Sequence, residues 1–123
     1  MARKASARQW LRVSGSVGFM VKYKIPLTEM PFVEAAPAVR HKIHDRDGRR
    51  LRLVEYDQSM VPHWCERGHV GQILDGQMEI EFATGTVSFG PGDGVDIPSG
   101  EMHRHRARIL SKRVLALFVE DTD

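Results

Sequence analysis

The chain has 123 residues, a length typical of one domain that buries a single core. Hydrophobic residues make up 41% of it and charged residues 28%, which is ordinary for a soluble protein, and no run of about 18 apolar residues that could span a membrane occurs. One cysteine, Cys65, excludes an internal disulfide and is typical of a reduced thiol, so we expect a cytoplasmic protein without a membrane partner.

The charge is unevenly distributed. The formal net charge is +2, but residues 1–19 carry four basic side chains and no acidic one, so the rest of the chain carries −2. A nucleic-acid-binding domain would show clustered basic charge on its folded body, so no nucleic-acid partner is expected. Residues 1–19 lack the apolar region of a secretory signal, and a transit peptide or an internal start at Met20 are the alternatives to a flexible extension. We expect a basic, flexible extension over residues 1–19 and one domain over residues 20–123.

The pattern of the remaining chain predicts short strands. Six prolines leave little uninterrupted sequence for helices, and residues 26–37 are expected to be extended with at most one short turn. Residues 114–119, VLALFV, are apolar at every position and predict a strand that is buried on both faces. Regularly spaced short strands indicate an all-β sandwich or closed barrel with little helix. The other expected strands and turns are residues 39–44, the turn Asp47-Gly48, 50–53, 70–74, the turn Asp75-Gly76, 78–82, the turn Thr84-Gly85, 86–89, the turn Pro91-Gly92, 94–97, the turn Pro98-Ser99-Gly100, and 102–106.

The strongest chemical signal is the stretch HWCERGH, residues 63–69, which holds two histidines and the only cysteine. Residues i and i+2 of a strand share a face, so His63 and Cys65 are expected to point the same way. His69 opens the next strand, and His103 follows the turn at residues 98–100. If all four face the barrel interior, they predict a site for one divalent transition metal.

The same residues resemble the two motifs of the cupin superfamily. The first motif, G-x5-H-x-H-x3,4-E-x6-G, corresponds to Asp57-x5-His63-x-Cys65-x3-His69-x6-Gly76, and the second, G-x5-P-x-G-x2-H-x3-N, to Gly92-x5-Pro98-x-Gly100-x2-His103-x3-Ala107. Six positions match, and 15 residues separate the motifs. The resemblance covers roughly residues 36–120 and implies a small cupin 2 type protein with a jelly-roll barrel, the double-stranded β-helix. It also implies a homodimer, for which the outer face of residues 114–119 offers an apolar surface.

By position in these motifs, the resemblance implies that His63, Cys65, His69 and His103 bind the metal. Cysteine and histidine replace the family's second histidine and its glutamate, and this softer set favours zinc, nickel or iron over manganese. Cys65 has an alternative role as a small buried hydrophobe, and His69 as a polar barrel residue. We expect His105 to line the pocket rather than to bind the metal.

The resemblance implies a small-molecule ligand in the barrel but leaves the activity open. One hypothesis is a metal-dependent enzyme acting on a small polar molecule, of the dioxygenase or isomerase type. Another is a non-catalytic module that binds or senses a metal or a small molecule, and a third is a barrel with a vestigial site. No catalytic residue is assigned, although Glu55 shares the parity of Leu51 and Leu53 and is expected to point into the barrel as an acid or base.

Overall fold

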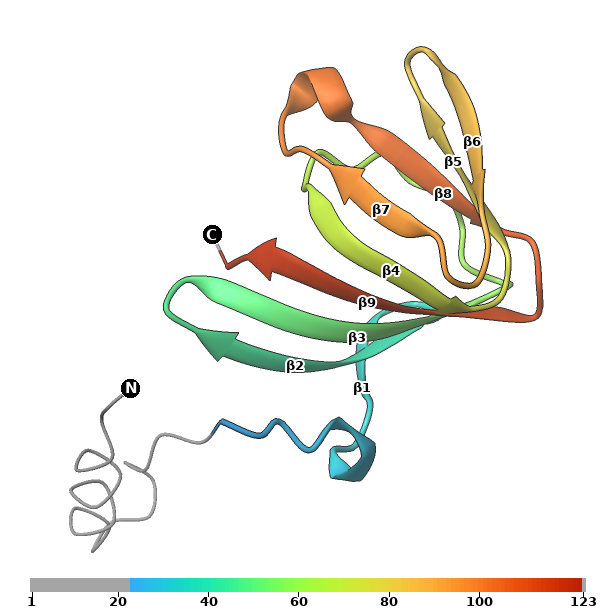
Figure 1. Cartoon of the computed structure of the whole chain (residues 1–123). Coiled ribbons are helices and arrows are strands. Elements are labelled where there is room, and N and C mark those ends of the chain that lie inside the picture. The colour runs from blue at the N-terminus through green and yellow to red at the C-terminus, as the bar shows by residue number, and fades with distance from the viewer. Residues whose placement is uncertain (1–22, 123) are drawn as a thin grey trace, which may run out of the picture.

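The computed structural model describes residues 23–122, which form two antiparallel sheets facing each other (Figure 1). The larger sheet has the strand order β1-β2-β3-β9-β4-β7, and the smaller has the order β6-β5-β8. The expectation for residues 1–19 lies outside the described residues. The strands are β1 (Val33–Ala36), β2 (Val39–Arg46), β3 (Arg49–Asp57), β4 (His69–Asp75), β5 (Met78–Phe82), β6 (Gly85–Phe89), β7 (Gly94–Ile97), β8 (His105–Ile109) and β9 (Arg113–Asp121).

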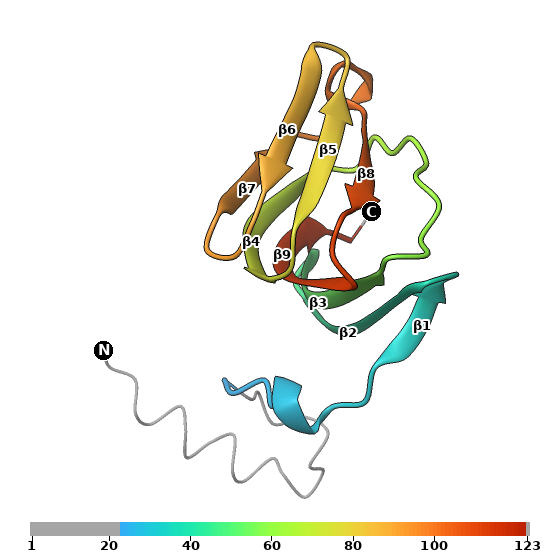
Figure 2. The same ribbon diagram turned by 90° about the vertical axis from the view of Figure 1, so that its right-hand side faces the viewer.

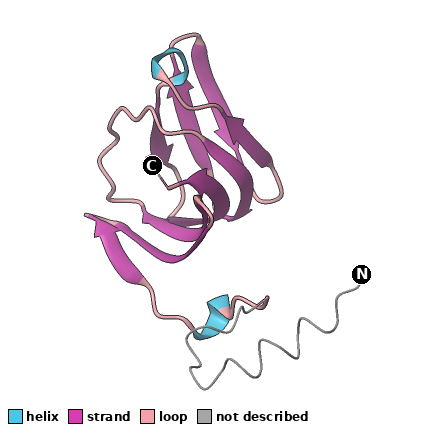
Figure 3. Ribbon diagram, turned by 90° about the vertical axis from the view of Figure 1, so that its left-hand side faces the viewer, coloured by secondary structure: helices cyan, strands magenta, loops and turns pink. Residues whose placement is uncertain are grey.

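Helix is confined, within residues 23–122, to two single turns of 3-10 helix, η2 (Leu27–Glu29) and η3 (Glu101–His103), as Figure 3 shows. In that part of the chain no helix is long and apolar enough to cross a membrane. The all-β jelly-roll architecture expected from the sequence is therefore confirmed.

The turn between β2 and β3 lies where the sequence predicts it. Asp47 and Gly48 both have positive φ, 52° and 78°, and the flanking Arg46 and Arg49 are paired across the hairpin. Two central residues with positive φ define the type I′ turn, whose twist matches that of the strands it joins. Asp-Gly is the favoured sequence for this turn, which explains why these two residues alone were sufficient to predict the hairpin.

Strand β9 lies between β3 and β4 in the larger sheet and alternates strictly between the two faces. Val114, Ala116 and Phe118 point inward and are buried, whereas the outward-facing Val119 is 43% exposed. The prediction of a strand here is confirmed, but its burial on both faces is wrong because the outer face is only partly covered. The core consists of Val39, Val54, Met60, Ile73, Met78, Ile80, Val95, Ile97, Ile109, Val114, Ala116 and Phe118.

Strand β3 faces the opposite way to that expected. Leu53 is the direct partner of the outward-facing Leu117, and Val54 is the partner of the buried Ala116. Glu55 therefore lies on the outer face, where it forms ion pairs with Arg40 and Arg113. Its expected inward orientation is wrong, because the leucines of β3 belong to an outer apolar surface. The residues that alternate with these leucines, including Arg52, line the interior.

The segment before β1 covers part of that outer surface on β2. The ammonium of Lys42 donates a hydrogen bond to the carbonyl of Leu27 at 2.6 Å. Lys42 and Arg40 also stack on the ring of Phe32, at 4.6 and 4.5 Å from its centroid. Such cation–π contacts fix the lysine stem over the ring and explain why Lys42 is only 9% exposed.

Residues 58–68 form the long connection from β3 to β4, drawn in green in Figure 2. His63 lies in this loop and not on a strand, contrary to the expectation. Cys65 is paired with the first residue of β8: its amide donates to the carbonyl of His105 at 2.8 Å, and the amide of His105 donates to the carbonyl of Cys65 at 2.9 Å. This isolated antiparallel bridge brings the loop against the start of β8.

The single strand expected over residues 102–106 is also not formed. Gly100 has φ of 124°, a conformation open to glycine, and it precedes the 3-10 turn η3, which ends at His103. Strand β8 then begins at His105. His103, at the end of the turn, is exposed, whereas His105, at the start of the strand, is buried.

Candidate metal centre

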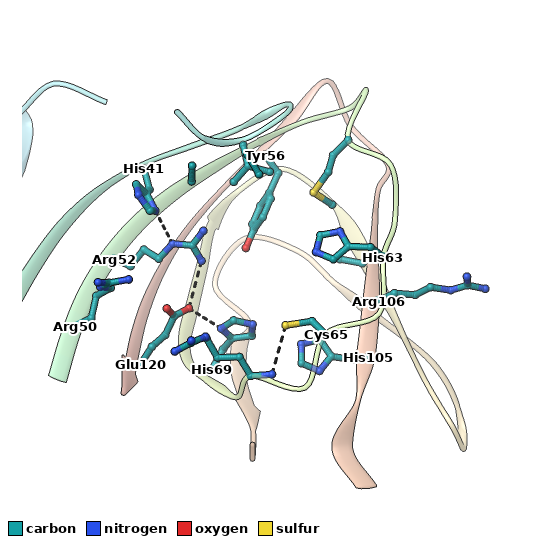
Figure 4. Close-up of a pocket in the computed structure, with 16 residues that line it drawn as sticks. His41, Arg50, Arg52, Tyr56, His63, Cys65, His69, His105, Arg106 and Glu120 are labelled. Atoms are coloured by element: carbon teal, nitrogen blue, oxygen red, sulfur yellow. Dashed lines mark hydrogen bonds and ion pairs between the residues drawn. The ribbon is translucent and has the colours of Figure 1, made fainter. Parts of the chain in front are cut away.

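Three side chains bring their ligand atoms together at one end of the barrel. Cys65, His69 and His105 each offer one atom, and these atoms lie within 4.8 Å of one another. They come from the loop before β4, the first residue of β4 and the first residue of β8. Cys65 and His105 share a face because they are directly paired, and His69 has the inward parity of the buried Ile73. Figure 4 shows all three beside a common cavity.

Both histidines of this group use one ring nitrogen for a bond that fixes their orientation. The Nδ1 of His69 donates to Oε2 of Glu120 at 2.7 Å, and the Nδ1 of His105 donates to the carbonyl of His103 at 3.0 Å. The Nε2 of His105 is left fully buried without a hydrogen-bond partner. A carboxylate or carbonyl on one nitrogen, with the other nitrogen free, is the arrangement in which histidine binds metals, and His105 has it, whereas His69 is also bonded to Cys65.

Glu120 is a buried carboxylate that connects this group to an arginine. Its Oε2, which accepts from His69, also accepts from Nη1 of Arg52 at 3.3 Å. Burial alone would raise the pKa of Glu120, but the hydrogen bond to His69 and the charge of Arg52 outweigh it and hold the pKa below its usual value. Glu120 is therefore an ionised acceptor that keeps the proton of His69 on Nδ1.

The protonation pattern suits a metal at Cys65 and His105 but not at His69. The hydrogen bond to His69 is the main reason that the pKa of the Cys65 thiol is lowered, and the amide of Arg67, 3.4 Å from the sulfur, adds to it. Burial lowers the pKa of His69, but its bonds to Cys65 and Glu120 outweigh this and raise it. Burial lowers the pKa of His105, which is therefore a neutral donor. Thiolate and neutral imidazole are the forms that coordinate metals, so a metal bound here would have to displace the second ring proton that the raised pKa of His69 favours.

A cavity of about 310 Å³ opens beside these groups. In Figure 4 the hydroxyl of Tyr56 points into it, opposite Cys65 and His69. Its wall consists of Ala35, Ala36, Val39, His41, Arg50, Arg52, Tyr56, Met60, His63, Cys65, Arg67, His69, His105, Arg106, Ala107 and Glu120. A volume of this size suits a bound small molecule.

The structure brings together only two of the four residues expected to bind the metal. Cys65 and His69 belong to the group of three, whereas His63 is exposed and lines the same cavity without belonging to it. His103 is exposed in η3 and also lies outside the group. The ligand roles of His63 and His103 stay predictions. His105 lines the pocket as expected, but its buried Nε2, which has no hydrogen-bond partner, makes it a candidate metal ligand, which the sequence analysis did not expect.

Sequence reasoning missed the residues that support the site, namely Glu120, Arg52 and Tyr56. Glu120 is the one that the sequence could have revealed, because it shares the inward face of β9 with Ala116 and Phe118. Arg52 and Tyr56 follow only from the orientation of β3, which its leucines obscured.

No family model and no curated protein matches the chain. Among solved structures, KdgF from a Halomonas species is 21% identical with a TM-score of 0.67, and the match covers 84% of this chain and 94% of that one. The cupin domain of Cnp3 from Schizosaccharomyces pombe also has a TM-score of 0.67, with 13% identity over 82% of this chain and 74% of that one. A cupin-2 domain protein from Shewanella frigidimarina has a TM-score of 0.54, with 17% identity over 66% of this chain and 78% of that one. At such identities the likeness is one of fold, and it confirms the resemblance that the sequence motifs carried: this chain is a small barrel of the cupin fold.

Proposed function

We propose that this protein binds one divalent transition metal through Cys65, His69 and His105, and binds a small polar molecule in the adjoining cavity. The single observation that carries the proposal is the Nε2 of His105, which is buried without a partner beside two other ligand-type atoms. A buried polar atom without a hydrogen bond is costly, and a metal would satisfy it.

The donor set fits a metal of intermediate softness. One thiolate and two imidazoles suit zinc, nickel or iron better than magnesium or manganese. Three protein ligands leave a further coordination position, which is the pattern of sites that act on a bound molecule. A metal there would act as a Lewis acid on a polar group of that molecule. His63, in the cavity wall, is the residue best placed to complete the set or to contact the bound molecule.

The cavity supports a ligand-binding role over a vestigial site. Its wall combines apolar side chains with convergent polar groups, which are the two components of small-molecule sites. Chemistry of the dioxygenase or isomerase type and non-catalytic binding would both use this arrangement. Homodimer formation and a cytoplasmic location are part of the same proposal, supported by the apolar outer face of β9 and by the single reduced thiol.

The test compares His105, which belongs to the proposed metal site, with His103, which lies in η3. Protein purified without a metal-affinity column is analysed for metal, reconstituted with zinc, nickel and iron, and titrated as the wild type, His105→Ala and His103→Ala. We expect one metal per chain, a large loss of affinity in His105→Ala, and little change in His103→Ala. Equal losses in both would restore His103 as a ligand, and a loss in His103→Ala alone would contradict the proposed set. Zero stoichiometry with all three metals would overturn the metal-binding function.

A further inference from the structure

We infer that the molecule bound in this cavity is a small organic acid whose carboxylate is bound by Arg52. This inference deepens the proposed function and rests on it. It begins with the charge of the cavity wall, which carries four arginines, Arg50, Arg52, Arg67 and Arg106, and one carboxylate, Glu120. An excess of positive charge around a half-enclosed cavity favours an anionic ligand.

Three of these arginines are bound to other groups of the protein near the surface. Arg50 forms an ion pair with Asp45 at 2.8 Å, and Arg106 forms one with Glu81 at 2.8 Å. Arg67 donates from Nη1 to the carbonyl of Asp121 at 2.9 Å. These three arginines contribute to the positive potential at the mouth of the cavity, but their hydrogen bonds and ion pairs are made with other groups of the protein.

Arg52 is different because its guanidinium lies deep in the cavity, with a side chain only 15% exposed. Its Nε donates to Nδ1 of His41 at 2.8 Å, and its Nη1 donates to Glu120 at 3.3 Å. The charge of Arg52 also acts on the nearby hydroxyl of Tyr56, although burial outweighs it and raises the pKa of that hydroxyl. A guanidinium has five N–H donors, so this arginine is held in place with donors left for a ligand.

The charge of Arg52 is only partly neutralised within the protein. Glu120 is its one ion-pair partner among the described residues, and the same Oε2 atom also serves His69. Burial and the charge of Arg52 lower the pKa of His41, so His41 accepts the Arg52 hydrogen bond as a neutral ring and adds no charge. The guanidinium therefore retains positive charge at a place where water is partly excluded, and an anion there would be stabilised.

A carboxylate fits this place better than a phosphate. The planar fork of arginine matches the two oxygens of a carboxylate, and the contact with Glu120, from Nη1 to the single atom Oε2, leaves donors of that fork free. Glu120 also repels any second anion, and the remaining N–H donors of Arg52 must outweigh that repulsion for an acid to bind. The shared Glu120 places Arg52 close to His69, so an acid bound by Arg52 would lie next to the metal donors.

The experiment uses the zinc-loaded full chain and titration calorimetry. Malonate is the carboxylate probe, malonamide is its neutral analogue, and inorganic phosphate is the competing anion. The variants are Arg52→Gln, Arg52→Lys and, as a control, Arg108→Gln, since Arg108 lies on β8 with a 66% exposed side chain paired with Glu79. We expect malonate to bind, Arg52→Gln to lose about tenfold or more in affinity, Arg52→Lys to lose less, and Arg108→Gln to match the wild type.

Several results would overturn the inference. They are malonamide or phosphate binding as tightly as malonate, unchanged malonate binding in Arg52→Gln, and no malonate binding by the zinc-loaded wild type. Arg52→Lys keeps the buried charge and serves if Arg52→Gln does not fold. Zinc content is measured in every sample, so loss of metal, which bears on the proposed function, is separated from loss of acid binding. If the wild type holds no zinc, Arg52-dependent malonate binding to the metal-free chain still decides the inference.

Discussion

Replacing Glu120 with glutamine removes one charge from the support of the site and little else. Oε2 of Glu120 accepts from both His69, at 2.7 Å, and Arg52, at 3.3 Å, and the residue is 5% exposed. Glutamine has the same shape and retains one oxygen that could accept both bonds. The His69 proton would then face a neutral amide in place of a carboxylate, and Arg52 would lose its ion-pair partner.

The expected effect has two parts. Loss of a carboxylate that supports a metal-binding histidine typically lowers metal affinity by about 10- to 100-fold, or about 1.4 to 2.7 kcal/mol. Folding should be destabilised by about 1 to 3 kcal/mol, because a buried charge-assisted hydrogen bond becomes a neutral one. Competition with a chromophoric chelator measures zinc affinity, and urea denaturation of the metal-free protein measures stability.

The matched control is Glu55→Gln. Glu55 is a partly buried carboxylate between two arginines, Arg40 and Arg113, and it lies on the outer face of the same sheet. We expect Glu55→Gln to leave zinc affinity unchanged. If Glu120→Gln binds zinc as tightly as Glu55→Gln and the wild type, the support assigned to Glu120 is refuted.

The remaining predictions concern stability and assembly. Ile73→Ala should cost about 2 to 5 kcal/mol in urea denaturation, because Ile73 is fully buried, whereas Leu74→Ala, at a 42% exposed position, should cost far less; similar losses would contradict the described core. Gly71→Ala should destabilise the protein severely, since a Cβ there would lie 1.9 Å from the carbonyl oxygen of Leu117, and a normal melting temperature would be the contrary result. In sedimentation the protein should have twice the 13.9 kDa mass of one chain, and Val119→Lys on the exposed outer face of β9 should shift it toward one; a wild type that sediments as a single chain refutes the dimer.

The parts of the fold that the sequence predicted are those set by neighbouring residues. Asp47-Gly48 determines its hairpin through the φ values that it permits, and period-two alternation marks strands wherever one face is buried. Strand β3 shows the limit of that rule. Its leucines pack on an outer surface that the segment before β1 partly covers, so apolar parity did not identify the barrel interior.

The candidate site, too, was predicted only where its residues are close in sequence. Cys65 and His69 are close in sequence and were identified, because spacing along the chain constrains them directly. His103 lies in a 3-10 turn and His105 opens β8, whereas the sequence predicted one strand over both, so it could not separate their roles. Glu120 and Arg52 reach the site through the pairing of β9 with β3, a long-range register that no local pattern contains.

The position of β9 has a consequence for the order of assembly. β3 and β4 are not neighbours of each other, and β9, the last strand in the chain, joins them within the larger sheet. During synthesis, residues 49–75 are made long before the strand that they must both pair with. The sheet therefore closes only after Asp121 has left the ribosome, and until then β3 and β4 expose edges that favour aggregation. Glu120 arrives with that last strand, so a metal that bound Cys65 and His69 earlier would meet histidine and thiol ligands that are not yet held in place.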